Sequence, residues 1–260
     1  PILTLPNGNG WPSNYKNIKY GTLPLVHDLK FSVNRPAAKL VEMLTVQKSF
    51  DFVTNNLHLT TLIKSEKRNG QVFTDMDYSP LALGGMTDGV YCSEIAAAYQ
   101  VFGNGGYYNE PYTYYKVTKA EKSKDEITLL EHNFVPERVM GEDSAYVMNR
   151  MLQQVIFGSG SPTGRHITKD WTEWGNIYGK TGTTGTSDSS GDAYFAGGTP
   201  YYVGACWLGY DWNKELNANQ TNYAQLLWSK CMKALHQGLE VKDYEHKGDT
   251  EEHYFCLTTG

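Results

Sequence analysis

A row of five residues, Lys180-Thr181-Gly182-Thr183-Thr184, has the groups that an acyl-transfer site needs. The ammonium group of Lys180 supplies positive charge, and the hydroxyls of Thr181 and Thr183 are suited to hydrogen-bond a substrate carboxylate. Gly182 has no side chain, so a substrate can lie directly against the backbone, and Thr184 extends the row. So short a pattern also occurs by chance, and the residues that accompany it decide its meaning.

Ser32 and Asn34 stand upstream of this row, at the start of a predicted helix that continues from Pro36 through Leu44. Ser and Asn satisfy the free N–H groups of a helix N-terminus, and Pro suits the first turn, so the pair can be a helix cap. As an S-x-N element that accompanies a Lys-Thr-Gly strand, the same side chains would belong to a catalytic site. The two residues alone leave both interpretations open.

The segments around these two elements resemble the transpeptidase domain of class A penicillin-binding proteins over most of the chain. The matching segments occur in the same order as in that family. They are Trp11-Pro12-Ser13-Asn14-Tyr15 and Tyr20-Gly21-Thr22-Leu23, then Leu81-Ala82-Leu83-Gly84-Gly85, Gly89-Val90, Glu94-Ile95-Ala96-Ala97-Ala98-Tyr99 and Phe102-Gly103-Asn104-Gly105-Gly106, then Gly158-Ser159-Gly160, and finally Thr199-Pro200-Tyr201-Tyr202 and Trp207-Leu208-Gly209-Tyr210-Asp211.

The resemblance implies a peptidoglycan D,D-transpeptidase that acts on stem peptides and is acylated by β-lactam antibiotics. It implies that Ser32 relays a proton toward the leaving amine, helped by the charge of Lys180. Asn34 would hydrogen-bond the amide carbonyl of the substrate and help to fix the lysine that acts as base. Thr181 and Thr183 would hold the terminal carboxylate, and the Thr183 backbone N–H would contribute one oxyanion-hole donor.

The family's nucleophile is not found where the resemblance places it. The family carries an S-x-x-K tetrad several tens of residues before S-x-N, whereas only 31 residues precede Ser32. The literal match Ser13-Asn14-Tyr15-Lys16 lies in surroundings rich in Pro, Gly and Asn, which indicate a loop and not a buried helix. We interpret this match as chance. We therefore expect the C-terminal part of a transpeptidase domain, with the nucleophile supplied by an N-terminal segment outside this chain.

Two other functions fit parts of the sequence. A domain of the same fold without its nucleophile would be a catalytically inactive wall-binding or regulatory module. A serine β-lactamase would share the Lys-Thr-Gly strand, but the sequence shows no obvious hydrolytic general base. Residues 185–191 make a longer link after Thr184 than close relatives are expected to have, and this link either reshapes access to the site or is a tolerated surface loop.

The residue pattern predicts an α/β (α+β) fold in which helices flank an antiparallel sheet, and the resemblance implies that this fold is of the β-lactamase/transpeptidase type. Segments 178–184, 193–197 and 201–208 are rich in aromatic or β-branched residues and are separated by Gly and Pro, as in antiparallel hairpins. Segment 142–157 is predicted to be a helix, because it begins with acidic residues and its apolar residues recur at helical spacing. Residues 119–126 are dense in charge and indicate a solvated excursion of a hairpin.

A second helix is predicted over 222–239. Its apolar stripe is expected to cover one face of the sheet, with Lys230 and Lys233 left in water. Residues 1–239 would then form the C-terminal portion of the transpeptidase domain, without its nucleophile segment, and the charged residues 240–260 a polar tail or extension. The expected stripe consists of Tyr223, Leu227, Cys231, Ala234 and Leu235.

Composition restricts the possible partners. The net charge is −5 and no basic stripe is present, which argues against a nucleic-acid partner. The resemblance implies a location on the extracytoplasmic face of the bacterial cell membrane. Because no run of 18 apolar residues exists, we expect the anchor in sequence absent from this chain. The four cysteines, of which Cys206 and Cys231 lie in apolar patterns, have no metal-ligand spacing, and neither a metal nor a cofactor is expected.

Overall fold

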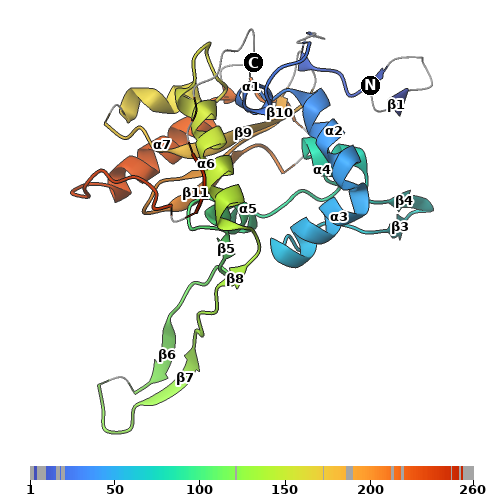
Figure 1. The fold of residues 1–260 in the computed structure, drawn as a ribbon. Helices are drawn as coiled ribbons and strands as arrows, with labels where there is room; N and C mark the ends of the chain where they lie inside the picture. Colours follow the sequence, from blue (N-terminus) through green and yellow to red (C-terminus); the bar gives the residue numbers. More distant parts are fainter. Residues whose placement is uncertain are drawn as a thin grey trace.

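The computed structural model describes residues 3–4, 10–15, 18, 21–120, 122–171, 173–185, 190–211, 214–217, 220–246, 248–251 and 253. Figure 1 shows helices gathered around a small sheet, and a long hairpin that projects from this body. The helices are α1 (Leu25–Lys30), α2 (Asn34–Leu44), α3 (Val46–Asp51), η2 (Phe52–Asn56), α4 (Tyr78–Leu83), α5 (Cys92–Tyr99), η3 (Gln100–Phe102), α6 (Glu142–Phe157), η4 (Arg165–Asp170) and α7 (Tyr223–Leu235). The strands are β1 (Leu3–Thr4), β2 (Gly10–Trp11), β3 (Glu66–Arg68), β4 (Gln71–Phe73), β5 (Tyr107–Tyr108), β6 (Lys116–Lys119), β7 (Ile127–Glu131), β8 (Glu137–Arg138), β9 (Tyr178–Gly185), β10 (Ser190–Gly198) and β11 (Val203–Leu208).

The central sheet has the order β11-β10-β9, and both pairings are antiparallel. This arrangement confirms the predicted fold class and places all three predicted strands in one sheet. The third strand begins later than predicted, at Val203. The reason is the turn before it, where the Thr199 N–H donates to the Tyr202 carbonyl at 2.8 Å, so Tyr201 and Tyr202 close a tight turn. Of the predicted long link after Thr184, residues 186–189 lie outside the described part of the chain.

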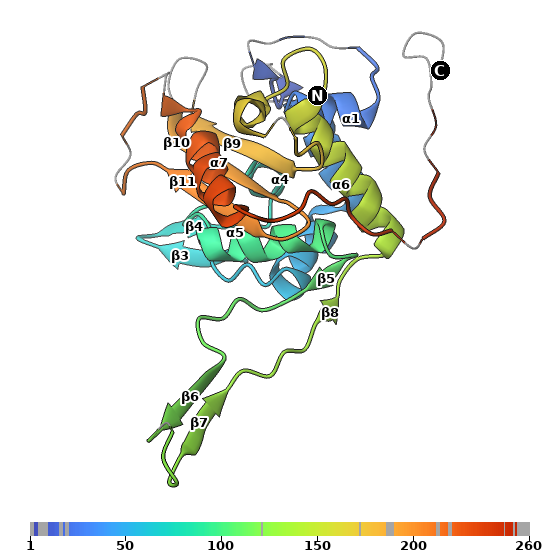
Figure 2. The same cartoon turned by 90° about the vertical axis from the view of Figure 1, so that its left-hand side faces the viewer.

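The sheet lies between helical layers (Figure 2). On one face, α7 and η4 cover the main hydrophobic core, in which Phe195, Trp228 and Trp171 are almost completely buried. Rings of Phe195 and Trp228 pack edge to face, with centroids 5.1 Å apart, which adds to the energy of their burial. The helix α5 packs against β10 and β11 from the other face. In this sheet β9 is an edge strand.

Helix α6 runs along β9 and has the bounds that the sequence predicts. Leu152 and Val155 of α6 pack against Tyr178, the first residue of β9. The Tyr178 hydroxyl donates to the Tyr99 carbonyl at 2.9 Å, so the phenol is buried with its polar group satisfied. These contacts tie the beginning of β9 to both α5 and α6.

The predicted apolar stripe of α7 is wrong. Tyr223, Leu227 and Leu235 are each about half exposed, at 49%, 52% and 55%. The helix buries another row, Ala224, Gln225, Trp228, Ser229 and Met232. The indole of Trp228 fills the space beside Gly204 and donates to its carbonyl at 3.1 Å, so the largest side chain sets the orientation of the helix.

The end of α7 also differs from the prediction. The helix stops at Leu235 with His236 as its C-cap, and Gly238 takes a left-handed conformation at φ +80°. A glycine adopts this conformation without steric cost, which makes it a natural helix stop.

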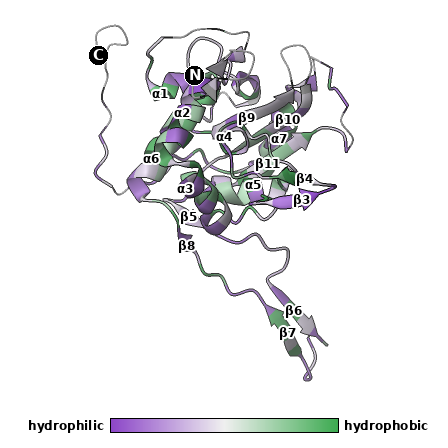
Figure 3. Cartoon of the chain, turned by 90° about the vertical axis from the view of Figure 1, so that its right-hand side faces the viewer, coloured by the Kyte–Doolittle hydropathy of each residue, from purple (hydrophilic) through white to green (hydrophobic). Residues whose placement is uncertain are grey.

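The strands β6 and β7 form the projecting hairpin, and most of the charged segment 119–126 forms its tip, which confirms the predicted solvated excursion. Glu121 lies outside the described residues. Ile127, Leu129 and Leu130 are 54–56% exposed, and Figure 3 shows hydrophobic residues on β7 far from the body. The hairpin is thus an exposed, partly apolar arm.

Residues after α7 contact α6. Asp243 pairs with Arg150 at 3.0 Å, the ring of His246 stacks on Tyr146 at 4.0 Å, and Tyr244 joins the cluster around Tyr178.

Among the residues that the structure describes, no helix has the length and apolar content to cross a membrane.

Candidate active site

The strand β9 carries Lys180, Gly182 and Thr184 on one face, because side chains along a strand alternate. Lys180 lies opposite Ala196, and Gly182 lies opposite Tyr194. The pairing is very close at Gly179, where an added Cβ would come within 2.4 Å of the Phe195 ring. The row predicted from the sequence therefore lies on an edge strand that is closely paired with β10.

A turn between α1 and α2 brings Ser32 to this edge. Ser32 has a φ of 55°, which is rare for a residue with a side chain, and its N–H donates to the Leu29 carbonyl at 3.1 Å. Val33, the next residue, is buried. The turn presents the Ser32 hydroxyl to β9, where Lys180 Nζ donates a hydrogen bond of 2.7 Å to Ser32 Oγ.

The helix-cap interpretation of Ser32 and Asn34 is wrong. Val33 is the N-cap of α2 and makes no side-chain capping hydrogen bond, and the side chain that accepts from the first turn is that of Asn14, whose Oδ1 accepts from the Arg35 N–H at 3.1 Å. Asn34 is the first residue of the helix, and its Nδ2 donates to the Ser13 carbonyl at 2.8 Å. Both side chains therefore point away from the helix N–H groups. The structure brings Ser32 and Lys180 into direct contact and places Asn34 beside them on the same groove.

Lys180 is the electrostatic centre of the site. Its Nζ donates to two neutral oxygens, Ser32 Oγ at 2.7 Å and its neighbour's carbonyl, Thr181 O, at 2.9 Å. Burial disfavours the charged ammonium and lowers the pKa of Lys180 from 10.5 to about 8. A carboxylate that enters the groove would compensate this charge, so the site favours an anionic ligand.

The groove beside β9 has a volume of about 570 Å³. Lys180, Thr181, Gly182, Thr183 and Thr184 form one wall, and Ser32 and Asn34 lie at its rim. The opposite wall is apolar and includes Leu29, Val33, Leu40, Leu83, Met148 and Met151. The groove thus combines a polar strand with a surface that suits apolar side chains.

Sequence reasoning missed two residues that shape this site. Tyr194 lines the groove, and its hydroxyl lies 3.4 Å from the Val90 carbonyl, to which it donates. Asp192 accepts hydrogen bonds from Thr184 and Trp207 at the end of β9. The sequence did offer one signal for both residues. They follow the Lys-Thr-Gly row after a link, and the next strand of an antiparallel hairpin must lie opposite the first.

In the described part of the chain, no residue of the S-x-x-K match at residues 13–16 lines the groove. Ser13 holds Asn34 through its backbone carbonyl and is not among the groove-lining residues, while Lys16 lies outside the described residues. That this tetrad is a chance match remains a prediction. In the described ranges, no group of three or more His, Cys, Asp or Glu residues is arranged for a metal ion. Cys256 lies outside them.

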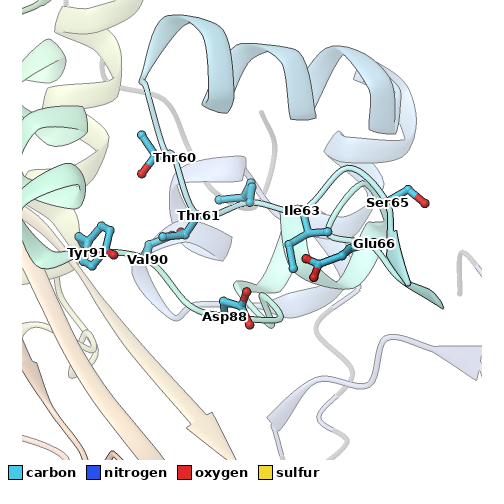
Figure 4. A pocket seen from close by; sticks show the side chains of 9 residues that line it. Thr60, Thr61, Ile63, Ser65, Glu66, Asp88, Val90 and Tyr91 are labelled. Carbon is cyan, nitrogen blue, oxygen red and sulfur yellow. The ribbon is translucent and has the colours of Figure 1, made fainter. Parts of the chain in front are cut away.

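A second pocket of about 600 Å³ shares the lining residue Val90 with the groove (Figure 4). Thr60, Thr61, Glu66 and Asp88 line it together with Tyr91 and four other residues. Both of its carboxylates pair with Arg68, at 2.9 and 2.6 Å. No lysine, histidine or cysteine lines this pocket, so the groove along β9 is the better candidate for acyl transfer.

Comparisons with known proteins show which family this chain resembles. The sequence profile described as penicillin binding protein transpeptidase domain matches residues 5–218. Penicillin-binding protein 1A of Clostridium acetobutylicum is 31% identical over 245 residues, which cover 92% of this chain and 27% of that protein. Penicillin-binding protein 4 of Bacillus subtilis is 32% identical over 201 residues, which cover 77% of this chain and 28% of that protein.

Solved structures show the same fold at lower identity. Penicillin-binding protein 1A from Haemophilus influenzae superimposes with a TM-score of 0.72 at 20% identity, covering 94% of this chain and 39% of that chain. The PonA1 protein of Mycobacterium tuberculosis in complex with penicillin V gives a TM-score of 0.67 at 16% identity, covering 96% of this chain and 65% of that chain.

The chain spans about a quarter of the length of the curated relatives described above. The resemblance to class A penicillin-binding proteins that the sequence shows is nevertheless confirmed across nearly its whole length. The match covers both the Ser32 element and the Lys180 strand. The chain belongs to the penicillin-binding protein transpeptidase domain family.

Proposed function

We propose that this chain supplies the substrate-binding and proton-relay half of a peptidoglycan D,D-transpeptidase site. The nucleophilic serine and its lysine come from an N-terminal segment outside this chain. The observation that carries the proposal is the 2.7 Å hydrogen bond between Lys180 and Ser32 at the head of a groove lined by Thr181, Gly182 and Thr183.

The polar wall of the groove suits the terminal carboxylate of a stem peptide. Lys180 offers a half-buried cation with two neutral partners, and Thr181 and Thr183, which also line the groove, add hydroxyl donors. The methyl-sized gap at Gly182 lets the peptide approach the backbone of β9. Thr184 extends the same wall toward the end of the strand. A β-lactam antibiotic with its own carboxylate would bind in the same way.

The reaction needs a nucleophile, a base, an oxyanion hole and a proton for the leaving group. The external serine attacks the peptide carbonyl, and its lysine takes the proton. The Thr183 N–H stabilises the oxyanion that forms. Ser32 passes a proton to the departing amine. Lys180, which is hydrogen-bonded to Ser32 Oγ, supplies that hydroxyl with a replacement proton. The resulting serine ester is then cut by the amine of a second stem peptide.

Asn34 has to change its hydrogen bond to take part. Its Nδ2 donates to the Ser13 carbonyl, while its side chain stands at the rim of the groove. In the assembled site this amide would donate to the carbonyl of the substrate, and its oxygen would accept from the lysine of the nucleophile segment. A rotation of one side chain is sufficient for this exchange.

Three open surfaces favour an additional segment. The groove wall formed by Leu29, Leu40 and Met148 is apolar, and a helix that carries a serine and a lysine on one face would cover it. In the described part of the chain the sheet ends at β11, whose outer edge has no strand partner. The α7 row of Tyr223, Leu227 and Leu235 is half exposed next to that edge. A strand and helices of one N-terminal segment would cover all three.

The proposed reaction places the domain on the extracytoplasmic face of the bacterial membrane, where peptidoglycan is cross-linked. Its anchor would lie in sequence outside this chain.

The relatives named penicillin-binding protein 1A, and the PonA1 structure with penicillin V, support a site of this kind, because those names and titles refer to penicillin binding.

Cross-linking of stem peptides by the protein together with its nucleophile segment tests the proposal. We expect Lys180→Ala and Ser32→Ala each to lower the rate about 100-fold or more, as loss of a transition-state donor typically does. Lys230→Ala, which changes an exposed lysine on α7, and Ser65→Ala, which changes an exposed serine, are the matched controls. A wild-type protein that binds peptidoglycan without cross-linking it would favour the inactive module.

A further inference from the structure

One carboxylate joins all three strands of the central sheet at the end nearest the groove. Asp192 Oδ2 accepts a hydrogen bond from Thr184 Oγ1 at 2.7 Å, and Asp192 Oδ1 accepts one from Trp207 Nε1 at 2.8 Å. The backbone N–H of Asp192 donates back to Thr184 Oγ1 at 2.9 Å. The three residues belong to β9, β10 and β11. We call this set the Asp192 bracket.

The bracket stands where the strand pairing is irregular. The register between β9 and β10 shifts between Ser190 and Ala193, so the backbone ladder is interrupted there. The chain after β11 also packs tightly against the bracket, because an added Cβ on Gly209 would come within 2.4 Å of Asp192 Oδ1. With the ladder interrupted, side-chain hydrogen bonds must determine where the end of β9 lies.

That end of β9 forms part of the groove. Thr184, which the carboxylate holds, lines the groove on the same strand face as Lys180 and Gly182. Thr183, whose N–H is the proposed oxyanion donor, lies between Gly182 and the residue that the bracket fixes. A displacement of Thr184 would therefore move the Thr183 N–H as well.

We propose that Asp192 is a positioning residue for acyl transfer, which holds the Thr183–Thr184 end of β9 in the geometry that the oxyanion requires. The inference rests on the proposed function. It assigns Asp192 no contact with substrate, and the effect reaches the reaction through Thr184. Trp207 completes the bracket by orienting the carboxylate from the other side.

The test is the acylation of the protein, together with its nucleophile segment, by benzylpenicillin under stopped-flow conditions. This measurement separates the dissociation constant of the non-covalent complex from the acylation rate constant. Asp192→Asn keeps the size of the side chain and an oxygen for Trp207, but it removes the acceptor for the Thr184 hydroxyl. Trp207→Phe removes only the indole N–H. Asp125→Asn, at the exposed tip of the arm, is the matched control.

We expect Asp192→Asn to lower the acylation rate constant about tenfold to 100-fold, since displacements of about 1 Å have effects of this size. The dissociation constant should change less than threefold, and Trp207→Phe should give a smaller loss of rate in the same direction. Thr184→Val should also slow acylation, and the double variant Thr184→Val/Asp192→Asn should be no slower than the slower single variant. Asp125→Asn should match the wild type.

Four outcomes would overturn the inference. An Asp192→Asn protein that melts at a lower temperature but is acylated at the wild-type rate well below that temperature would show a purely structural role. Rate losses that multiply in the double variant would show that Asp192 does not act through Thr184. A wild-type protein that is not acylated at all would remove the proposed function and this inference with it. Acylation by the wild type with an unchanged Asp192→Asn rate would remove this inference alone.

Discussion

Lys180 Nζ donates a hydrogen bond of 2.7 Å to Ser32 Oγ, although the two residues are 148 positions apart in the sequence. Two local features make this contact. Ser32 stands in a turn with a left-handed backbone, and Lys180 stands half-buried on an edge strand. The contact converts two short sequence patterns, neither of which is diagnostic alone, into one site with a cation and a hydroxyl.

The pKa of Lys180 predicts how activity depends on pH. Burial lowers this pKa to about 8, so the cation is present below pH 8 and is lost as the pH rises through that value. Because the cation is the form that binds carboxylate, kcat/KM should fall about tenfold per pH unit above pH 8. Lys180→Arg keeps its charge throughout this range and should lose that limb of the profile. The same limb in the arginine variant would assign it to another group.

The same burial predicts that Lys180 reduces the stability of the fold. The pKa of the folded state is below the unfolded value of 10.5, so the unfolded chain binds more protons between about pH 8 and 10.5. The free energy of unfolding should therefore rise with pH across this window. At pH 7, Lys180→Met should increase it by about 1–3 kcal/mol, measured by denaturant titration. Lys230→Met, at an exposed position, should change it by less than about 0.5 kcal/mol, and an equal gain there would contradict the explanation.

Substitutions at two glycines of the sheet test the stability of the fold and the binding of substrate separately. At Gly197 an added Cβ would lie 2.3 Å from the Tyr178 carbonyl oxygen, so Gly197→Ala should destabilise the fold by about 3 kcal/mol or more. At Gly182 an added Cβ would lie 3.2 Å from Tyr194 Cβ, which a small shift relieves. Gly182→Ala should therefore remain folded, yet its methyl group would occupy the space for substrate. Thermal melting and the rate of penicillin acylation measure the two effects, and a Gly182→Ala protein with the wild-type acylation rate would contradict the proposed substrate position.

A substitution in the exposed row of α7, which consists of Tyr223, Leu227 and Leu235, tests whether a further segment covers this row. In the protein together with its nucleophile segment, Leu227→Lys should lower the free energy of unfolding by about 2 kcal/mol, because a buried leucine of an interface would become a charge. Trp228→Ala should cost about 3–5 kcal/mol with or without that segment, since Trp228 is 1% exposed within this chain. Lys230→Glu is the control on the same helix. A Leu227→Lys protein as stable as the wild type would show that this row faces water.

The sequence predicted much of the fold correctly where the pattern was strong. The helix Glu142–Phe157 has an acidic first turn, a long apolar row and Gly158 after it, and its predicted bounds are the observed ones. The strand around Lys180 was also predicted correctly, because the segment is short, rich in aromatic and β-branched residues, and bounded by turn residues. In each case the local pattern and the tertiary environment favour the same conformation.

The errors arose where side-chain size and long-range contacts decide. Leu227 and Trp228 both offer apolar faces of α7, and only the space beside Gly204 selects the tryptophan. The contact between Ser32 and Lys180 depends on a positive φ that no propensity scale assigns to serine. The hydrogen bonds of Asp192 join three strands at a register shift and have no short sequence signature.

Intact-mass spectrometry after exposure to a penicillin tests the central claim most directly. The sample is this chain together with its upstream segment, followed by peptide mapping of the adduct. The account predicts one adduct per molecule on the serine of the upstream S-x-x-K tetrad, lost in Lys180→Ala and in Ser32→Ala. An adduct on Ser13, or no adduct on any serine, would contradict it.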